Sequence, residues 1–426
     1  MISALLIGLF LLFMFLRAPV SLAITLATGI AMLAGGYNLM VLPQKMIEST
    51  QSIELMAVPF FIFGANLMTA LGITRDIYEF ADALVGHLRG GLAQANVVAG
   101  VIFSGISGAA VADAAALGTI AMQEMPKAGY TKPFSAAVVV AVSTLGPMLP
   151  PSIMMVIYAI TAQVSIARMF VAGLLPALLV ALSLVATITV LTRLGWVVSP
   201  PPQRFSGARL LHSARAAFFA LLAPVVILRG MTTGWATPSE AGILVIFYAL
   251  LLGLVQRRIS LAKLHAALRN SIEATALIMF IIAVSTALSL VLVSEGTAQQ
   301  VGDILTAFSQ NPLIFLIVAN LALLVIGAVV ETLPAMLISV PVLLPTALKL
   351  GIDPVHFGVV IIFNLIVGIM TPPIGIGLYI LMALSNVRFG ELVIATIPFH
   401  LVLLLALAAL ICFPQLSLFL PHLVFG

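Results

Sequence analysis

The sequence predicts an all-α polytopic membrane protein with inverted-topology repeats, two re-entrant helical hairpins and two broken helices. Three observations lead to this fold class: the composition, the distribution of positive charge, and an internal repeat of glycine and proline positions. Of the 426 residues, 62% are hydrophobic and 8% are charged, whereas soluble globular domains carry about 25% charged residues. Lipid offers the backbone no hydrogen-bond partners, and the apolar runs are continuous rather than alternating, so each span is predicted to be a helix.

Charge and cysteine content narrow the possible functions. The sequence pI of 9.4 does not indicate a nucleic-acid partner, because the basic residues fall in short loops between apolar runs, as orientation signals do. The single cysteine, Cys412, excludes an internal disulfide framework and a cysteine-based zinc site. Neither H-E-x-x-H nor G-x-S-x-G occurs, so an intramembrane enzyme is only a remote alternative.

Many apolar runs reach the roughly 20 residues needed to cross the hydrocarbon. Continuous helices are expected over Ile2–Leu16, Val20–Leu33, Leu55–Leu71, Met169–Leu191, Ala216–Leu228, Glu240–Val255, Ile272–Val293 and Glu391–Phe413. Two more helices, Phe134–Ala162 and Pro354–Leu384, are expected to break at Pro-Pro pairs, because proline removes an amide donor. Separate amphipathic helices on the inner membrane surface are expected in Leu194–Ala216 and at the start of Gln256–Ala276.

Two other apolar stretches, Gly91–Met125 and Pro312–Leu348, are each too long for one span and have a polar middle. The middle reads FSGISGAAVADAAALG in the first stretch and GAVVETLP in the second. Each stretch is therefore predicted to form two half-length helices that enter the membrane and return on the same side.

The positive charges test this map. With the N-terminus outside, 14 of the 18 Lys and Arg residues fall inside, and only Lys45, Arg168, Arg229 and Lys349 fall outside. Because Lys and Arg are enriched in cytoplasmic loops, this bias sets the orientation, with the N-terminus outside. Reading either hairpin as a single crossing would invert every later loop and remove the bias.

An internal repeat relates the two hairpins. The pairs Pro150-Pro151 and Pro372-Pro373 lie 222 positions apart. The same offset matches Gly105 with Gly327, Lys127 with Lys349, Gly129 with Gly351, Gly146 with Gly368, Met148 with Met370, and Pro176 with Pro398. By the charge map, the first hairpin opens from inside and the second from outside. Inverted repeats of this kind are typical of secondary transporters.

The interruptions predict binding sites. A broken helix in lipid leaves backbone groups unpaired, at a cost of several kcal/mol each unless protein, water or an ion satisfies them. Exposed carbonyls beside Ser or Thr hydroxyls suit Na⁺, and half-helix N-termini favour an anion. One Na⁺ site is expected from Ser104, Gly105, Ser107, Thr144, Gly146 and Pro147, and a second from Gly327, Glu331, Thr332, Gly368, Met370 and Thr371. Substrate-binding residues are expected at Ser107, Gly108, Asp113, Pro151, Thr332 and Pro373.

Plainer interpretations stay open for single residues. Gly105 and Gly108 would also permit close helix packing. Asp113 lies in the first turn of the returning helix, where capping is at least as good an explanation as ligand binding. Glu331 points more strongly to function, because an ionisable group at membrane depth is functional by default.

Several motifs together resemble one family, the large membrane subunit (DctM-like) of tripartite ATP-independent periplasmic (TRAP) transporters. They are MAVPFFIFGANLM, FSGISGAAVADAAALG, LGPMLPPS, ATPSEAG and NLIVGIMTPPIGIGLYI, and the likeness covers nearly the whole chain. Two departures stand out: Glu331 replaces an expected Asp, and Ala109 and Ala110 stand where a second Ser is frequent.

The resemblance implies an elevator mechanism, in which a mobile transport domain slides its substrate along a scaffold. Scaffold helices are then expected in 1–89 and 193–311, with the cytoplasmic linker, and the transport-domain repeats in 90–192 and 312–413, followed by a periplasmic C-terminal tail at 414–426.

The family also implies Na⁺-coupled import of an organic acid, such as a C4-dicarboxylate or sialic acid, across the bacterial inner membrane. The expected partners are a separate small four-helix membrane subunit and a periplasmic substrate-binding protein. The alternative within transport is a stand-alone ion-coupled carboxylate carrier of related hairpin architecture.

Overall fold

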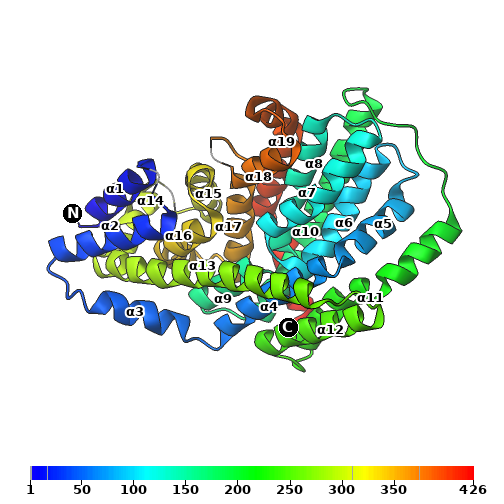
Figure 1. Ribbon diagram of the computed structural model, residues 1–426. Helices are drawn as coiled ribbons and strands as arrows, with labels where there is room; N and C mark the ends of the chain where they lie inside the picture. Colours follow the sequence, from blue (N-terminus) through cyan, green and yellow to red (C-terminus); the bar gives the residue numbers. More distant parts are fainter. Residues whose placement is uncertain (1, 17, 309, 374) are drawn as a thin grey trace.

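The computed structural model describes residues 2–16, 18–308, 310–373 and 375–426, in which every regular element is a helix (Figure 1). The first part contains α1 (Ile2–Phe15), α2 (Val20–Ala34), α3 (Val41–Thr50), η1 (Glu54–Met56), α4 (Ala57–Ala70), α5 (Ile73–Val85), α6 (Gly91–Ser107), α7 (Ala110–Lys127), α8 (Lys132–Ser143), η2 (Gly146–Met148), α9 (Ile153–Ala162) and α10 (Ile166–Arg193). The second contains α11 (Gly207–Thr232), α12 (Pro238–Val255), α13 (Leu261–Ser294), α14 (Thr297–Phe308), α15 (Pro312–Val329), α16 (Thr332–Lys349), α17 (Pro354–Gly368), α18 (Ile376–Ser385), α19 (Phe389–Cys412) and α20 (Gln415–Phe425).

The described helices confirm an all-α polytopic membrane fold. Seven of them, α10, α11, α12, α13, α15, α16 and α19, are long and apolar enough to cross a membrane. The number reaches nine if the bent pairs α3–α4 and α8–α9 each count as one span. Arg17, which the charge map places inside, lies outside the described residues.

Both hairpins are present. The helices α6 and α7 pack against each other across a two-residue turn at Gly108 and Ala109, and α15 and α16 do so across Val330 and Glu331. The arms contain 17 or 18 residues, which corresponds to about 26 Å. The depth to which these arms enter the membrane stays a prediction.

The broken helices interrupt where the prolines predicted. Helix α8 gives way to η2 and then α9, with a bend of 41° between the two halves. Helix α17 ends at Gly368, and α18 begins at Ile376. The Pro150–Pro151 and Pro372–Pro373 peptide bonds are both cis.

Two expected surface helices turned out to be continuous with spans. Helix α11 has 26 residues and α13 has 34, and each begins at a serine cap, Ser206 or Ser260, that accepts a backbone hydrogen bond. No helix-ending signal separates the amphipathic start from the apolar span, so one helix forms. The short helices α3, α5, α14 and α20 were missed, because a search for full spans passes over helices of 10 to 13 residues.

The expected C-terminal tail is the helix α20. It packs against α10, and Ser417 forms a buried 2.7 Å hydrogen bond with Nδ1 of His356 at the start of α17. The C-terminus thus contacts helices of both repeats.

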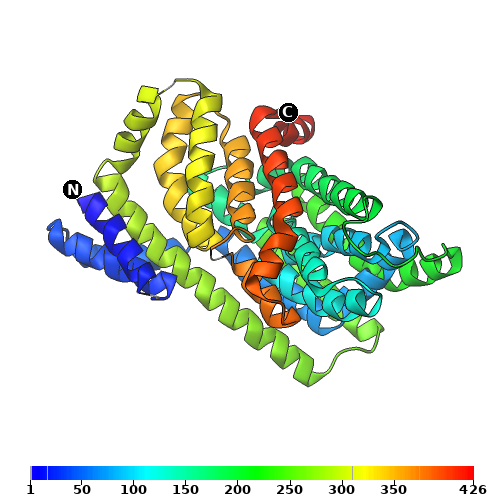
Figure 2. The same ribbon diagram turned by 90° about the horizontal axis from the view of Figure 1, so that it is seen from above.

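Helix α13 is the longest element and lies along one edge of the molecule, in yellow-green (Figure 2). It packs against α2, α3 and α4, and also against α16 of the second hairpin. The two repeats interleave, because α18 packs on α7 and α8, while α9 packs on α16. The division into scaffold and transport domain stays a prediction.

Each hairpin tip meets the broken helix of its own repeat at a glycine. Gly108 has φ +63°, and a Cβ added there would lie 2.1 Å from the carbonyl oxygen of Pro151. In the second repeat, a Cβ added at Gly368 would lie 2.6 Å from the carbonyl oxygen of Gly327. Only glycine permits these backbone approaches.

Gly368→Ala is therefore expected to destabilise the protein by about 1–3 kcal/mol, because the added methyl group meets rigid backbone. The matched control is Gly29→Ala in α2, where a Cβ meets nothing within 4 Å and helix propensity predicts a small gain. Thermal unfolding of the purified protein measures both. Equal melting temperatures in the two variants would contradict the close packing at Gly368.

Candidate functional site

The first hairpin tip holds a buried carboxylate. Asp113, in the first turn of α7, is fully buried and accepts hydrogen bonds from the hydroxyls of Ser104, at 2.7 Å, and Ser107. It makes no side-chain capping bond to the start of α7. Capping therefore does not explain Asp113, whose carboxylate instead joins the two arms of the hairpin.

The first broken helix faces this carboxylate. A Cβ added at Gly146 would lie 2.5 Å from Oδ2 of Asp113, so the backbone of η2 passes directly beside it. Among the described residues, no hydrogen bond ends on the carbonyl oxygens of Gly105, Ser107, Thr144 or Gly146. Hydroxyl, carboxylate and free carbonyl oxygens are the donors that a hard cation prefers, so the residues present fit a Na⁺ site.

The other residues expected at the first site have different surroundings. The Thr144 hydroxyl donates to the carbonyl oxygen of Ala141 at 2.6 Å, within its own helix end. Gly105 faces α11, since a Cβ there would lie 2.9 Å from Cγ of Pro224. Gly105 therefore permits close packing of α6 against α11, which is the plainer interpretation that the sequence left open.

The second tip carries Glu331 immediately before α16. Its carboxylate makes no hydrogen bond to a described residue, and Glu331 and Thr332 line two cavities of about 150 Å³ each. The Thr371 hydroxyl donates to the carbonyl oxygen of Val367 at 2.9 Å, and Met370 is fully buried. The second site therefore has one free carboxylate, whereas the first site has a carboxylate held by two hydroxyls.

A buried amide pair in the second repeat escaped the sequence interpretation. Nδ2 of Asn364 donates to the carbonyl oxygen and to Oδ1 of Asn320, at 2.8 and 2.7 Å. The sequence signal that could have revealed this pair is one asparagine within each of two apolar runs. The pair joins α15 to α17 one to two turns from the contact between Gly327 and Gly368.

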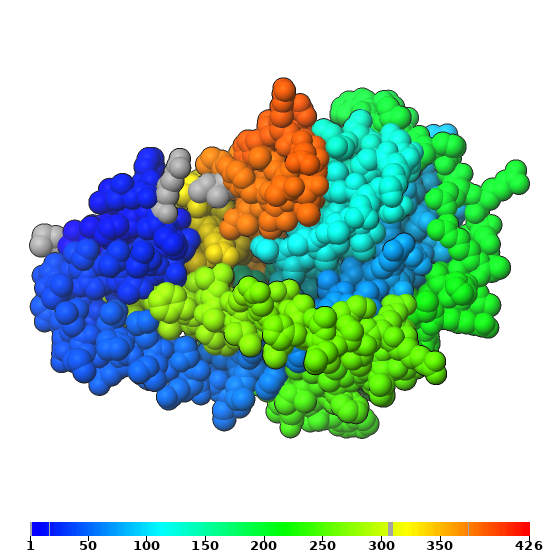
Figure 3. All heavy atoms as spheres, viewed as in Figure 1, coloured from blue at the N-terminus to red at the C-terminus, as the bar shows by residue number. Residues whose placement is uncertain are grey.

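One cavity lies where the two repeats meet, and we call it the central cavity. Its volume is about 150 Å³, and α13 contributes Ile278. The remaining lining comes from both tips and both breaks: Gly108, Ala109, Ala110, Val111, Pro147, Ile153, Met154, Glu331, Thr332, Leu333, Ile369 and Ile376. Figure 3 shows α13 in yellow-green, crossing this face beneath the cyan of the first hairpin and the orange of the second repeat.

Four helices begin at the central cavity. Ala110, Ile153, Thr332 and Ile376 are the first residues of α7, α9, α16 and α18, and all four line it. Helix N-termini carry a partial positive charge, so their convergence favours an anion, although the first N–H of α9 is already bonded to the carbonyl oxygen of Gly108. This is the geometry expected for a carboxylate ligand beside a cation site.

The structure separates the expected substrate residues into two groups. Gly108 and Thr332 line the central cavity, with Ser107 and Asp113 connected behind it by their hydrogen bond. Pro151 is buried against Gly108, and Pro373 is exposed; neither is among the residues that line the cavity. The prolines thus shape the breaks instead of lining the cavity.

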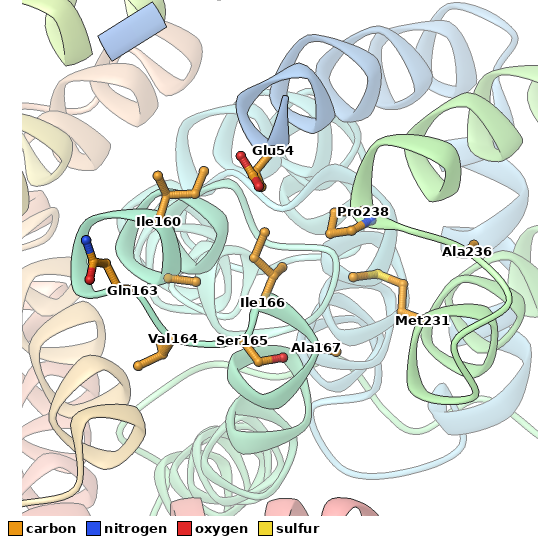
Figure 4. Close-up of a pocket in the computed structure, with 11 residues that line it drawn as sticks. Glu54, Ile160, Gln163, Val164, Ser165, Ile166, Ala167, Met231, Ala236 and Pro238 are labelled. Atoms are coloured by element: carbon orange, nitrogen blue, oxygen red, sulfur yellow. The ribbon is translucent and has the colours of Figure 1, made fainter. Parts of the chain in front are cut away.

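A larger cavity of about 480 Å³ lies at the turn between α9 and α10 (Figure 4). Two of its polar groups are engaged locally: Glu54 accepts from Ser52, and the Ser165 hydroxyl accepts from the backbone N–H of Arg168. Gln163 also lines the cavity, and its side-chain amide makes no hydrogen bond to a described residue; the remaining lining is mainly aliphatic.

Comparison with known proteins identifies the family. The family model for the tripartite ATP-independent periplasmic transporter, DctM component, matches residues 7–416. The sialic acid TRAP transporter large permease protein SiaM of Vibrio cholerae is 37% identical over 90% of each chain. The C4-dicarboxylate TRAP transporter large permease protein DctM of Pseudomonas aeruginosa is also 37% identical, over 89% of this chain and 88% of its own.

A solved structure shares the fold. The YdaH transporter of Alcanivorax borkumensis superposes with a TM-score of 0.55 at 17% identity, covering 88% of each chain. The family match and the two relatives exclude the intramembrane-enzyme alternative. The chain is a membrane transport protein and belongs to the DctM component family of TRAP transporters.

Proposed function

We propose that this chain is the large subunit of a Na⁺-coupled importer for an organic acid in the bacterial inner membrane. The observation that carries the proposal is the convergence of four helix N-termini on the central cavity. Such a cavity suits the carboxylate of a small organic acid. The similar proteins named for sialic acid and C4-dicarboxylate transport support the same substrate class.

The position of Glu331 is our reason for proposing that substrate transport is coupled to a cation. Its carboxylate lines the same cavity as the four N-termini, so an anionic substrate bound there meets a like charge. A cation beside Glu331, and another among Ser104, Ser107 and Asp113, would offset that repulsion. Substrate and Na⁺ would then bind more tightly together than apart, which is the thermodynamic requirement for symport.

The mechanism we propose is an elevator. The two hairpins and broken helices would move together along α13, whose Ile278 faces the central cavity. A small four-helix subunit would bind the scaffold helices, and a periplasmic protein would deliver the substrate. The periplasmic N-terminus expected from the charge bias is part of this proposal.

Uptake into proteoliposomes tests the function. The chain is reconstituted with the small membrane subunit and the binding protein from its own gene neighbourhood, and radiolabelled succinate and N-acetylneuraminate serve as probes. We expect accumulation of one probe under an inward Na⁺ gradient, and none when K⁺ replaces Na⁺. Uptake that needs no binding protein would favour the stand-alone carrier, and uptake indifferent to Na⁺ would contradict the coupling.

Ser104→Ala tests the first cation site in the same assay. It removes the 2.7 Å hydrogen bond to Asp113 and one oxygen donor. The Na⁺ concentration for half-maximal uptake is expected to rise by roughly tenfold or more, since hydrogen bonds to charged groups contribute about 1.5–3 kcal/mol. The control is Ser183→Ala in α10, whose hydroxyl donates only to the carbonyl oxygen of Leu179. Equal Na⁺ dependence in both variants would count against the site.

A further inference from the structure

The largest of the described cavities lies beyond the proposed substrate site, and we call it the Lys45 cavity. Its volume is about 540 Å³, compared with about 150 Å³ for the central cavity. Pockets for small molecules commonly measure about 300–1,000 Å³. Four helices line it, through Lys45, Glu48 and Ser49 of α3, Ile157, Ile160 and Thr161 of α9, Ile282, Ser285, Thr286 and Ser289 of α13, and Leu337 and Pro341 of α16, with Ser52, Leu55 and Gln163 beside them.

The lining of the Lys45 cavity is mainly apolar, but it contains one cation and several hydroxyl groups. Lys45 pairs with Glu48 at 2.7 Å on the surface of α3, and these are its only charged lining residues. Hydroxyl groups come from the same face of α13, at Ser285, Thr286 and Ser289. A carboxylate entering the cavity can replace Glu48 at Lys45, while the hydroxyls bind its other polar groups.

One of these hydroxyls is buried without a partner. Ser285 is 1% exposed, and its Oγ makes no hydrogen bond in the part of the chain that the structure describes. Other hydroxyls on α13 bond to their own helix: Thr286 donates to Ile282 at 2.9 Å, and Ser294 donates to Leu290 at 2.8 Å. A buried hydroxyl without a partner is unfavourable, so Ser285 indicates a ligand that is bound for part of the transport cycle.

The same three helices, α9, α13 and α16, line both the Lys45 cavity and the central cavity. On each helix, a residue that lines the central cavity is followed four positions later by a residue that lines the Lys45 cavity. These pairs are Ile153 and Ile157 of α9, Ile278 and Ile282 of α13, and Leu333 and Leu337 of α16. Four residues of helix rise by about 6 Å. A single turn of aliphatic side chains therefore separates the two cavities.

We propose that the Lys45 cavity is a second binding site for the transported organic acid, in line with the central cavity and closed from it by this aliphatic layer. The inference rests on the proposed import function. Ser285 donates a hydrogen bond to the substrate, and Lys45 pairs with its carboxylate. Lys45 belongs to the set expected outside, so this site receives the substrate before the central cavity does.

Ser285→Ala separates binding from a structural role. A buried hydroxyl without a protein partner contributes no internal hydrogen bond, so its loss should not lower the melting temperature. The KM for the probe that the parent imports, succinate or N-acetylneuraminate, is expected to rise by roughly five- to tenfold. Ser294→Ala, near the C-terminal end of the same helix and outside the cavity lining, is the matched control and should keep the parental KM.

Cysteine labelling gives an independent readout. Ser289→Cys is made in a Cys412→Ser background, because Cys412 is an exposed free thiol. A membrane-impermeant thiol reagent added outside should label Ser289→Cys, and the imported probe should slow the labelling. If the parent imports the probe, a parental KM in Ser285→Ala together with labelling that the probe does not slow would overturn the second site. That result would leave the proposed import function standing.

Discussion

The architecture depends on how backbone groups are satisfied where helices break inside a membrane. Each break frees N–H and carbonyl groups that lipid cannot pair. In the first repeat, the Gly108 carbonyl accepts from the N–H of Ile153 at 3.3 Å, so the hairpin tip completes the start of α9. Glycine at the contact lets the backbones meet, as it does again between Gly327 and Gly368. Each hairpin tip thus packs closely against the helix break of its own repeat.

This pairing also creates the candidate functional site. When tip and break of each repeat meet, and the repeats interleave, four helix N-termini arrive at one cavity. Positive helix ends alone would favour an anion at all times, but Glu331 on the same cavity opposes it. The buried Asp113, held by Ser104 and Ser107, adds a second negative charge behind the first tip. We propose that a site of this composition binds its anion well only when cations are present, and this is the basis of the proposed coupling.

Local signals in the sequence predicted the interruptions, and tertiary contacts determined the rest. The Pro-Pro pairs and the 222-residue offset located both breaks and both tips, because proline and glycine act on the backbone directly. The depth that the hairpin arms reach stays a prediction, since nothing in an apolar run marks where membrane depth ends. The bond between Asp113 and Ser104, the contact of Gly105 with Pro224, and the unpaired Ser285 all require knowledge of which helices face each other.

The most direct test of the account is whether Na⁺ binds at the first tip. The melting temperature of the purified chain is measured in NaCl and in KCl at equal ionic strength, for the parent and for Asp113→Asn. A ligand that binds only the folded state raises its stability, so Na⁺ should raise the parent's melting temperature by several degrees more than K⁺, with a smaller difference in Asp113→Asn. Equal melting temperatures of the parent in the two salts, or an undiminished Na⁺ effect in Asp113→Asn, would contradict Na⁺ binding at the first hairpin tip.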